Sequence, residues 1–319
     1  MRFQLSWIPS GDYAYAFVAK ELGFWSELGL DVQIDRGFGS SRTASDVAAG
    51  QYEVGEASFS MVANTVSKGG ALVGLGARYQ KSPIGIMALK KKGLKRPKDL
   101  EGMTVGSAPG SAASVLFPAF ARATGIDASK VTFQALSPGA GPPSMLAGKV
   151  DALATFYNSS APSFIAKGIA FDFLFFADHG LDMLDQTFIT QPRTLKENRE
   201  MVGRFVEGAL KGAAYTYLHP EKAVEITLRH LQGQTREIVE VALGVATALG
   251  LSSLVEQKGI GWMDPALVGG SVDKVVRYMG GREIRDVGGL YTNEFIGKVQ
   301  LTADQWEKAR SYGQKYLPS

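Results

Sequence analysis

The sequence contains no cysteine and only three histidines among its 319 residues. Without cysteine the chain cannot form disulfides, thiolate nucleophiles, thiolate-ligated zinc sites or iron–sulfur clusters. The histidines, His179, His219 and His230, include no pair at the spacing of a metal site. We therefore expect the protein to hold no metal and no cofactor.

An excess of one charge and long apolar runs are also missing. The 34 Lys and Arg residues nearly balance the 31 Asp and Glu residues, whereas nucleic-acid binding needs a clustered basic surface. No segment reaches the ~18 consecutive apolar residues of a membrane-spanning helix. The sequence thus argues against a nucleic-acid partner and predicts a soluble chain.

Motifs of nucleotide binding and of nucleophilic catalysis are absent as well. The phosphate-binding pattern GxxxxGK[ST] fails at Gly148 and Lys149, because valine follows them. The dinucleotide pattern GxGxxG starts at Gly74 but ends on Tyr79. No serine occurs in a GxSxG context. We therefore do not expect an enzyme.

The length and the hydrophobic pattern predict a two-lobed α/β protein. A chain of 319 residues exceeds the ~250 to 300 residues at which a single core stops growing. Short β-rich runs alternate with amphipathic segments, which predicts mainly parallel sheets flanked by helices. The expected strands are Phe3–Trp7, Leu30–Asp35, Glu53–Ala57, Leu72–Arg78, Ser82–Leu89, Met103–Ser111 with its loop, Val131–Ala135, Asp151–Phe156, Phe171–Phe176 and Thr187–Gln191. The expected helices are Tyr15–Leu22, Thr43–Ala49, Met61–Ser67, Ala113–Ala123, Arg199–Tyr217, Glu221–Arg229, Arg236–Leu249 and Pro265–Met279.

The strand pattern restarts near Ser82–Leu89, which predicts a crossing into a second lobe. We expect lobe 1 to comprise residues 1–83 and 190–319, and lobe 2 residues 84–189. The segment after Leu195 has too few strands for a domain of its own, so its helices should complete lobe 1. The two crossings, Ser82–Gly85 and Thr187–Pro192, would then form a hinge.

Small and polar residues follow several of these strands, at the edge where open α/β sheets bind their ligands. The loops are Ile8–Tyr13, Gly37–Thr43, Ser58–Ser60, Gly106–Ala112 and Tyr157–Ser160. The candidate contact residues in and beside them are the small or polar Gly39, Ser40, Ser107, Gly110, Ser111 and Ala112, and the aromatic Trp7, Tyr13, Phe38, Phe59 and Tyr157. As alternatives, the serines would cap helices and the aromatic side chains would fill the core.

Four blocks of the sequence resemble one family. They are AKELGFWSELGLDVQI (19–34), GSSRTASDVAAGQYEVGEAS (39–58), RPKDLEGMTVGSAPGSA (96–112) and LAGKVDAL (146–153). These blocks are similar to segments of the periplasmic solute-binding proteins of ABC importers for nitrate, sulfonates, taurine and thiamine pyrimidine precursors. The resemblance implies the type II periplasmic binding fold, in which two α/β lobes close on a small molecule.

The first loop is most similar to the pyrimidine-precursor branch of this family, whose W-x-P-x-x-x-[HY] motif matches Trp7, Pro9 and Tyr13. In that branch a flat heterocycle stacks on aromatic rings and hydrogen-bonds to carboxylates and amides. Carried onto this chain, the resemblance implies ligand contacts by Trp7, Asp12, Tyr13, Tyr157, Asn158 and Asp185.

The resemblance also implies a biological role. It predicts an extracytoplasmic monomer, periplasmic or lipid-anchored and freed of its signal peptide, that delivers a small-molecule ligand to an ABC permease in the inner membrane. A sulfonate, nitrate, taurine or flavin ligand is an alternative, as is an enzyme acting on a pyrimidine in the same cleft. A related eukaryotic pyrimidine synthase shares the fold but depends on a cysteine-rich motif, which this sequence lacks.

Overall fold

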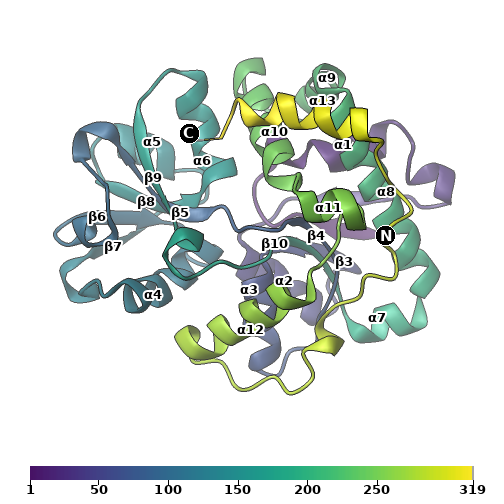
Figure 1. The fold of residues 1–319 in the computed structure, drawn as a ribbon, viewed down its shortest axis with the longest axis horizontal. Helices are drawn as coiled ribbons and strands as arrows, with labels where there is room; N and C mark the ends of the chain where they lie inside the picture. The colour runs from purple at the N-terminus through teal and green to yellow at the C-terminus, as the bar shows by residue number, and fades with distance from the viewer. Residues whose placement is uncertain (318–319) are drawn as a thin grey trace.

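The computed structural model describes residues 1–317, which form two five-stranded sheets (Figure 1). The first sheet contains β1 (Arg2–Gln4), β2 (Gln33–Asp35), β3 (Val54–Ala57), β4 (Val73–Tyr79) and β10 (Asp185–Thr190). The second contains β5 (Ile84–Leu89), β6 (Thr104–Ser107), β7 (Thr132–Ala135), β8 (Ala152–Phe156) and β9 (Phe171–Phe175). Every strand expected from the sequence is therefore present.

The two sheets are built alike. Their strand orders are β2-β1-β3-β10-β4 and β7-β6-β8-β5-β9. Strand β10 runs antiparallel to both of its neighbours, and so does β5, whereas the remaining pairs are parallel. Each reversed strand is the first that the chain forms after crossing between the sheets. The expected architecture of mainly parallel sheets with two crossings is confirmed, with one reversed strand in each sheet.

Helices cover both sheets (Figure 1). They are α1 (Ala14–Glu21), α2 (Ser40–Ala48), α3 (Phe59–Ser67), α4 (Ala112–Thr124), α5 (Gly141–Leu146), α6 (Tyr157–Ala166), α7 (Pro192–Glu197), α8 (Arg199–Leu218), α9 (Pro220–His230), α10 (Arg236–Gly250), α11 (Ser253–Lys258), α12 (Pro265–Met279) and α13 (Ala303–Gln314). Within residues 1–317, no helix combines the length and the apolar character needed to cross a membrane.

The loop expected at Tyr157–Ser160 is wrong, because α6 begins at Tyr157 without an intervening turn. Its sequence, rich in serine and interrupted by Pro162, has a weak intrinsic preference for helix. Extensive packing of α6 against α10 provides the tertiary contacts from which most helical stability comes.

The Gly23–Phe24–Trp25 motif closes α1 against α8. The Trp25 ring stacks on Phe205 at a centroid distance of 5.4 Å, and its Nε1 donates to the Phe205 carbonyl oxygen at 2.9 Å. Gly208 makes this contact possible, since a Cβ atom there would lie 2.1 Å from the indole Cδ1. The family-like motif therefore holds the helical tail onto the first sheet's layer.

Two hydrogen bonds hold segments together at the junction of the two sheets. Ser82, in the first crossing, donates its hydroxyl hydrogen to the Asp185 carboxylate at the start of β10. The Tyr157 hydroxyl of α6 donates to the Tyr316 carbonyl oxygen at 3.2 Å. This contact matches the course of the chain in Figure 1, where the segment after α13 runs toward α6.

Candidate ligand-binding cavity

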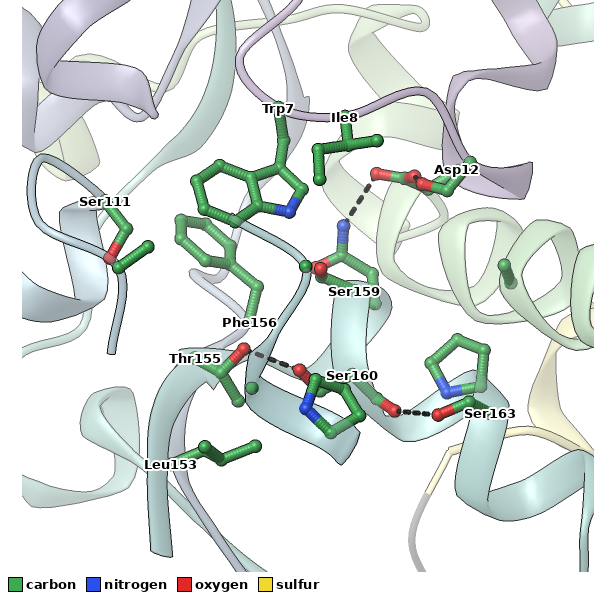
Figure 2. A pocket seen from close by; sticks show the side chains of 18 of the residues that line it. Trp7, Ile8, Asp12, Ser111, Leu153, Thr155, Phe156, Ser159, Ser160 and Ser163 are labelled. Carbon is green, nitrogen blue, oxygen red and sulfur yellow. Dashed lines mark hydrogen bonds between the residues drawn. The ribbon is translucent and has the colours of Figure 1, made fainter. Parts of the chain in front are cut away.

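A cavity of about 390 Å³ lies between the two sheets. Its walls come from the segment after β1, the start of α2, the loop between β6 and α4, the segment that runs from the end of β7 through α5, the end of β8 with α6, one residue of β10, and helix α10 with the residue Gln234 before it. Pockets for small organic ligands typically measure ~300 to 1,000 Å³. Figure 2 shows Trp7 and Ile8 entering from one wall and Phe156 and Ser160 from the opposite one.

Nine of the predicted contact residues line this cavity: Trp7, Asp12, Tyr13, Gly39, Ser40, Ser107, Ser111, Ala112 and Asn158. All three of the serines also have structural partners. The Ser107 hydroxyl donates to the Ala154 carbonyl oxygen at 2.7 Å. The Ser111 Oγ accepts the Ser114 N–H at 3.1 Å and so caps α4, and the Ser40 Oγ accepts the Ser58 N–H at 3.1 Å. For Ser111 the capping role and the position at the cavity therefore coexist.

Three predicted aromatic contacts lie outside the lining. Phe38 is 51% exposed and its ring faces the Arg36 guanidinium, while Phe59 is fully buried in the hydrophobic core. The Tyr157 ring packs against Phe173 and its neighbours in β9, because α6 starts directly after β8 and turns this side chain away.

Gly110 and Asp185 also lie outside the lining, and both make hydrogen bonds near the junction of the two sheets. The Gly110 carbonyl oxygen accepts the Ser41 N–H at 3.2 Å, beside the lining residues Ser40 and Ser111. The fully buried Asp185 carboxylate accepts the Ser82 hydroxyl and, at 2.7 Å, the Gln186 N–H. Asp185 thereby links the two crossings of the chain.

Sequence reasoning missed other lining residues, among them Phe156, Gln186, Gln234 and Ile238. Phe156 is the last residue of β8, so the strand-end argument selected the residue one position too late, at Tyr157. Gln234 precedes α10 and Ile238 lies within it, and this region reaches the cavity only through the tertiary fold. No local pattern could have identified them.

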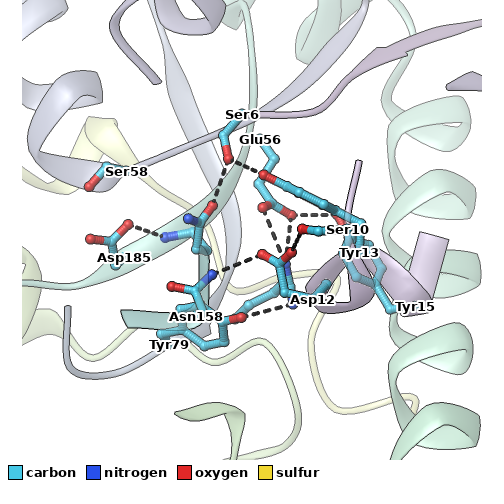
Figure 3. A network of polar contacts seen from close by, with 12 residues as sticks. Ser6, Ser10, Asp12, Tyr13, Tyr15, Glu56, Ser58, Tyr79, Asn158 and Asp185 are labelled. Atoms are coloured by element: carbon cyan, nitrogen blue, oxygen red, sulfur yellow. Dashed lines mark hydrogen bonds and ion pairs between the residues drawn. The ribbon is translucent and has the colours of Figure 1, made fainter. Parts of the chain in front are cut away.

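A polar bridge joins the two sides of the cavity at Asp12 and Asn158. The Asn158 Nδ2 donates to Asp12 Oδ2 at 2.9 Å, and the Ser10 hydroxyl donates to Oδ1 (Figures 2 and 3). Burial raises the pKa of Asp12, while the Arg78 charge and the hydrogen bonds from Ser10 and Asn158 oppose the rise. The bridge spans from the segment after β1 to the first turn of α6.

A buried ion pair lies next to the backbone of Asp12. The Arg78 Nη1 is 3.2 Å from Glu56 Oε1, and both side chains are almost fully buried. The Arg78 Nη2 donates to the backbone carbonyl oxygen of Asp12, and Tyr15 donates its hydroxyl hydrogen to Glu56 (Figure 3). The ion pair therefore fixes the backbone that carries Asp12.

Two amide side chains give the cavity both hydrogen-bonding characters. Asn158 is 2% exposed, and because its Nδ2 faces Asp12, its Oδ1 is a buried acceptor without a protein partner within residues 1–317. The Gln186 Oε1 accepts the Ser6 hydroxyl at 3.0 Å, which leaves its Nε2 as a donor. Gln186 has φ of 49°, a strained value for a residue other than glycine.

The cavity contains little charge. Of its lining residues only Asp12 and Lys167 are charged, and Lys167 is exposed. Over residues 1–317, no group of three or more histidine or acidic side chains is placed to hold a metal ion.

Asp185 makes folding stability depend on pH. Burial raises the pKa of this carboxyl from 3.8 to about 6. The folded state therefore binds the proton more tightly, so this contribution to stability is complete below pH 3.8 and is lost as pH rises through about 6. We expect Asp185→Asn to stabilise the protein by about 2 kcal/mol more at pH 7.5 than at pH 4.5, measured by urea unfolding. An equal effect at both pH values would contradict it.

A sequence profile of the NMT1/THI5-like family matches residues 10–223. The formylaminopyrimidine-binding protein of Halalkalibacterium halodurans is 26% identical over 227 residues, which cover 70% of this chain and 68% of that protein. The riboflavin-binding protein of Chloroflexus aurantiacus is 23% identical over 305 residues, 92% of this chain and 84% of that protein.

Solved structures share the fold. The periplasmic nitrate-binding protein of Synechocystis superposes with a TM-score of 0.67 at 14% identity, covering 100% of this chain and 90% of that one. At this identity the likeness establishes the periplasmic binding protein fold alone.

Proposed function

The chain belongs to the NMT1/THI5-like family, and on that premise we propose that it is the extracytoplasmic solute-binding component of an ABC importer. It captures a small, flat heteroaromatic ligand, similar to a thiamine pyrimidine precursor, and a permease in the inner membrane receives it. In this proposal the protein is a periplasmic monomer. Its lobes are residues 1–83 with 190–319, and 84–189, except that all of β10 (Asp185–Thr190) pairs within the first sheet, which moves the second boundary to the segment between β9 and β10.

One observation carries the ligand assignment: Trp7 and Phe156 enter the cavity from opposite walls (Figure 2), and the amides of Asn158 and Gln186 belong to the same lining. Aromatic side chains stack on flat rings. The Asn158 Oδ1 and the Gln186 Nε2 supply an acceptor and a donor, which match the alternating groups on the edge of a heterocycle. Closure of the lobes would bring the two aromatic rings and the two amides onto the ligand.

A sulfonate or nitrate ligand is the second candidate, because α2 and α4 begin at cavity residues Ser40 and Ala112. Helix N-termini favour anions. Against this stands the buried Asp12 carboxylate in the same cavity. A calorimetric panel of hydroxymethyl-aminopyrimidine, formylaminopyrimidine, riboflavin, taurine and nitrate distinguishes the two. Binding of the oxyanions alone would overturn the heteroaromatic assignment, and chemical conversion of a bound compound would favour an enzyme.

Domain closure is tested by small-angle X-ray scattering. We expect the radius of gyration to fall when a saturating ligand is added, since the two crossings, between β4 and β5 and between β9 and β10, would absorb the motion. A profile that does not change on saturation would contradict closure. The ligand used is whichever compound of the panel binds most tightly.

We expect Trp7→Ala to weaken binding of a flat ligand by ~1 to 3 kcal/mol, by analogy with base stacking on aromatic side chains. Phe38→Ala is the matched control, because Phe38 is an aromatic residue of the same region that is 51% exposed and lies outside the cavity lining. Isothermal titration calorimetry measures both. A loss of only a few tenths of a kcal/mol for Trp7→Ala would assign its ring to structural packing.

A further inference from the structure

The cavity continues past the Trp7 and Phe156 rings along helix α6. The residues on this far side are Leu153, Thr155, Ser160, Ser163 and Lys167, which we call the side compartment. Figure 2 shows Thr155, Ser160 and Ser163 beyond Phe156 as seen from Trp7, with Leu153 at the bottom of the view. The cavity is therefore elongated, with an aromatic part and a hydroxyl-lined part.

The hydroxyl groups of the side compartment bond mainly to one another. The Thr155 and Ser160 hydroxyl oxygens are 2.7 Å apart, and the Ser163 hydroxyl donates to the Ser160 carbonyl oxygen at 3.1 Å. Ser160 is 3% exposed. In such a pair one O–H donates to the other, so one further O–H and several lone pairs stay free for a group inside the cavity.

The charge and the size of the cavity further limit the ligands that fit. The sole cation lining the cavity within residues 1–317 is Lys167, which is exposed, whereas the carboxylate of Asp12 is buried. A buried anion without a cation beside it would be penalised heavily. The Asn158 Oδ1, buried and unpartnered, needs a donor. The cavity of about 390 Å³ corresponds to roughly 13 water volumes at ~30 Å³ each. It therefore has more room than a single ring occupies.

We propose that the ligand is an uncharged flat ring carrying a hydroxylated chain, with a ring N–H on the Asn158 Oδ1 and the chain in the side compartment. This inference rests on the proposed function and refines it. The Thr155 and Ser160 hydroxyls exchange hydrogen bonds with the chain. The exposed Lys167 contacts the terminus of the ligand's hydroxylated chain.

Riboflavin and lumiflavin test this directly, because they share one ring system and lumiflavin has a methyl group in place of the hydroxylated chain. We expect calorimetry to show riboflavin binding at least ~10-fold more tightly, the equivalent of one or two net hydrogen bonds. The double variant Thr155→Val/Ser160→Ala removes both members of the hydroxyl pair and so leaves no orphaned partner. It should lose most of this preference while its lumiflavin affinity stays at the wild-type value.

Ser129→Ala is the control variant, because Ser129 is an exposed serine far from the cavity lining, and it should keep the full preference. Equal affinities for the two flavins would overturn the inference and leave the proposed function intact. Binding of the aminopyrimidines without either flavin would do the same. If only nitrate or taurine binds, the inference and the heteroaromatic assignment fall together.

Discussion

We expect a Gly39→Ala variant to bind ligand about 100-fold more weakly than the wild type. This factor corresponds to a fall in the population of the closed form to roughly one part in a hundred. Gly39 has φ of 123°, and a Cβ built on it would lie 2.5 Å from the Gly110 carbonyl oxygen, on the opposite side of the cavity mouth. The same two segments exchange the Ser41–Gly110 hydrogen bond. An added methyl group on residue 39 would thus hold the two lobes apart.

Gly110→Ala separates this clash from backbone strain. Gly110 has φ of 80°, but a Cβ there would meet nothing within 4 Å. Each substitution places an L-residue at a positive φ that favours glycine, so each should lower stability by ~1 to 3 kcal/mol. Titration calorimetry and thermal melts on both variants are the measurement. Similar melting temperatures with affinity lost only in Gly39→Ala are expected, and equal affinities would contradict a role of this contact in closure.

The contact residues that sequence reasoning could place are those that follow strands. Trp7, Ser40 and Ser107 lie at the cavity because the ends of parallel strands meet at one sheet edge, and the hydrophobic pattern locates those ends within a few residues. The same reasoning cannot decide between Phe156 and Tyr157. That choice depends on α6 starting without a loop, and the start of α6 depends on its packing against α10.

Long-range polar contacts are the part that local patterns cannot supply. Glu56 and Arg78 lie in strands whose sequences read as ordinary buried β segments, and nothing in them indicates that the two charges meet. Asp185 was predicted from a family resemblance as a ligand contact, yet it is bonded to Ser82 and Gln186 outside the cavity lining. Such partners are specified by how the sheets come together.

The buried ion pair leads to the largest expected effect on stability. We expect Arg78→Met to lower the free energy of unfolding by ~3 to 5 kcal/mol, because removing one partner leaves an uncompensated buried charge. Glu56 would lose its counter-charge, and the Asp12 carbonyl oxygen would lose its donor. Ligand affinity should fall as well, since the backbone carrying Asp12 would no longer be held. Urea unfolding followed by circular dichroism measures the first effect.

Two further variants show whether charge burial is the cause. Arg193→Met breaks the Arg193–Glu197 pair on α7, whose side chains are 80% and 54% exposed, and should change stability by less than ~1 kcal/mol. Arg78→Met/Glu56→Gln removes both buried charges while an amide oxygen can still accept the Tyr15 hydroxyl. This double variant should therefore be more stable than Arg78→Met alone. If it were equally unstable or worse, the loss would arise from the other contacts of Arg78, its hydrogen bond to the Asp12 carbonyl oxygen and its packing against the Tyr15 and Tyr79 rings, rather than from the unpaired Glu56 carboxylate.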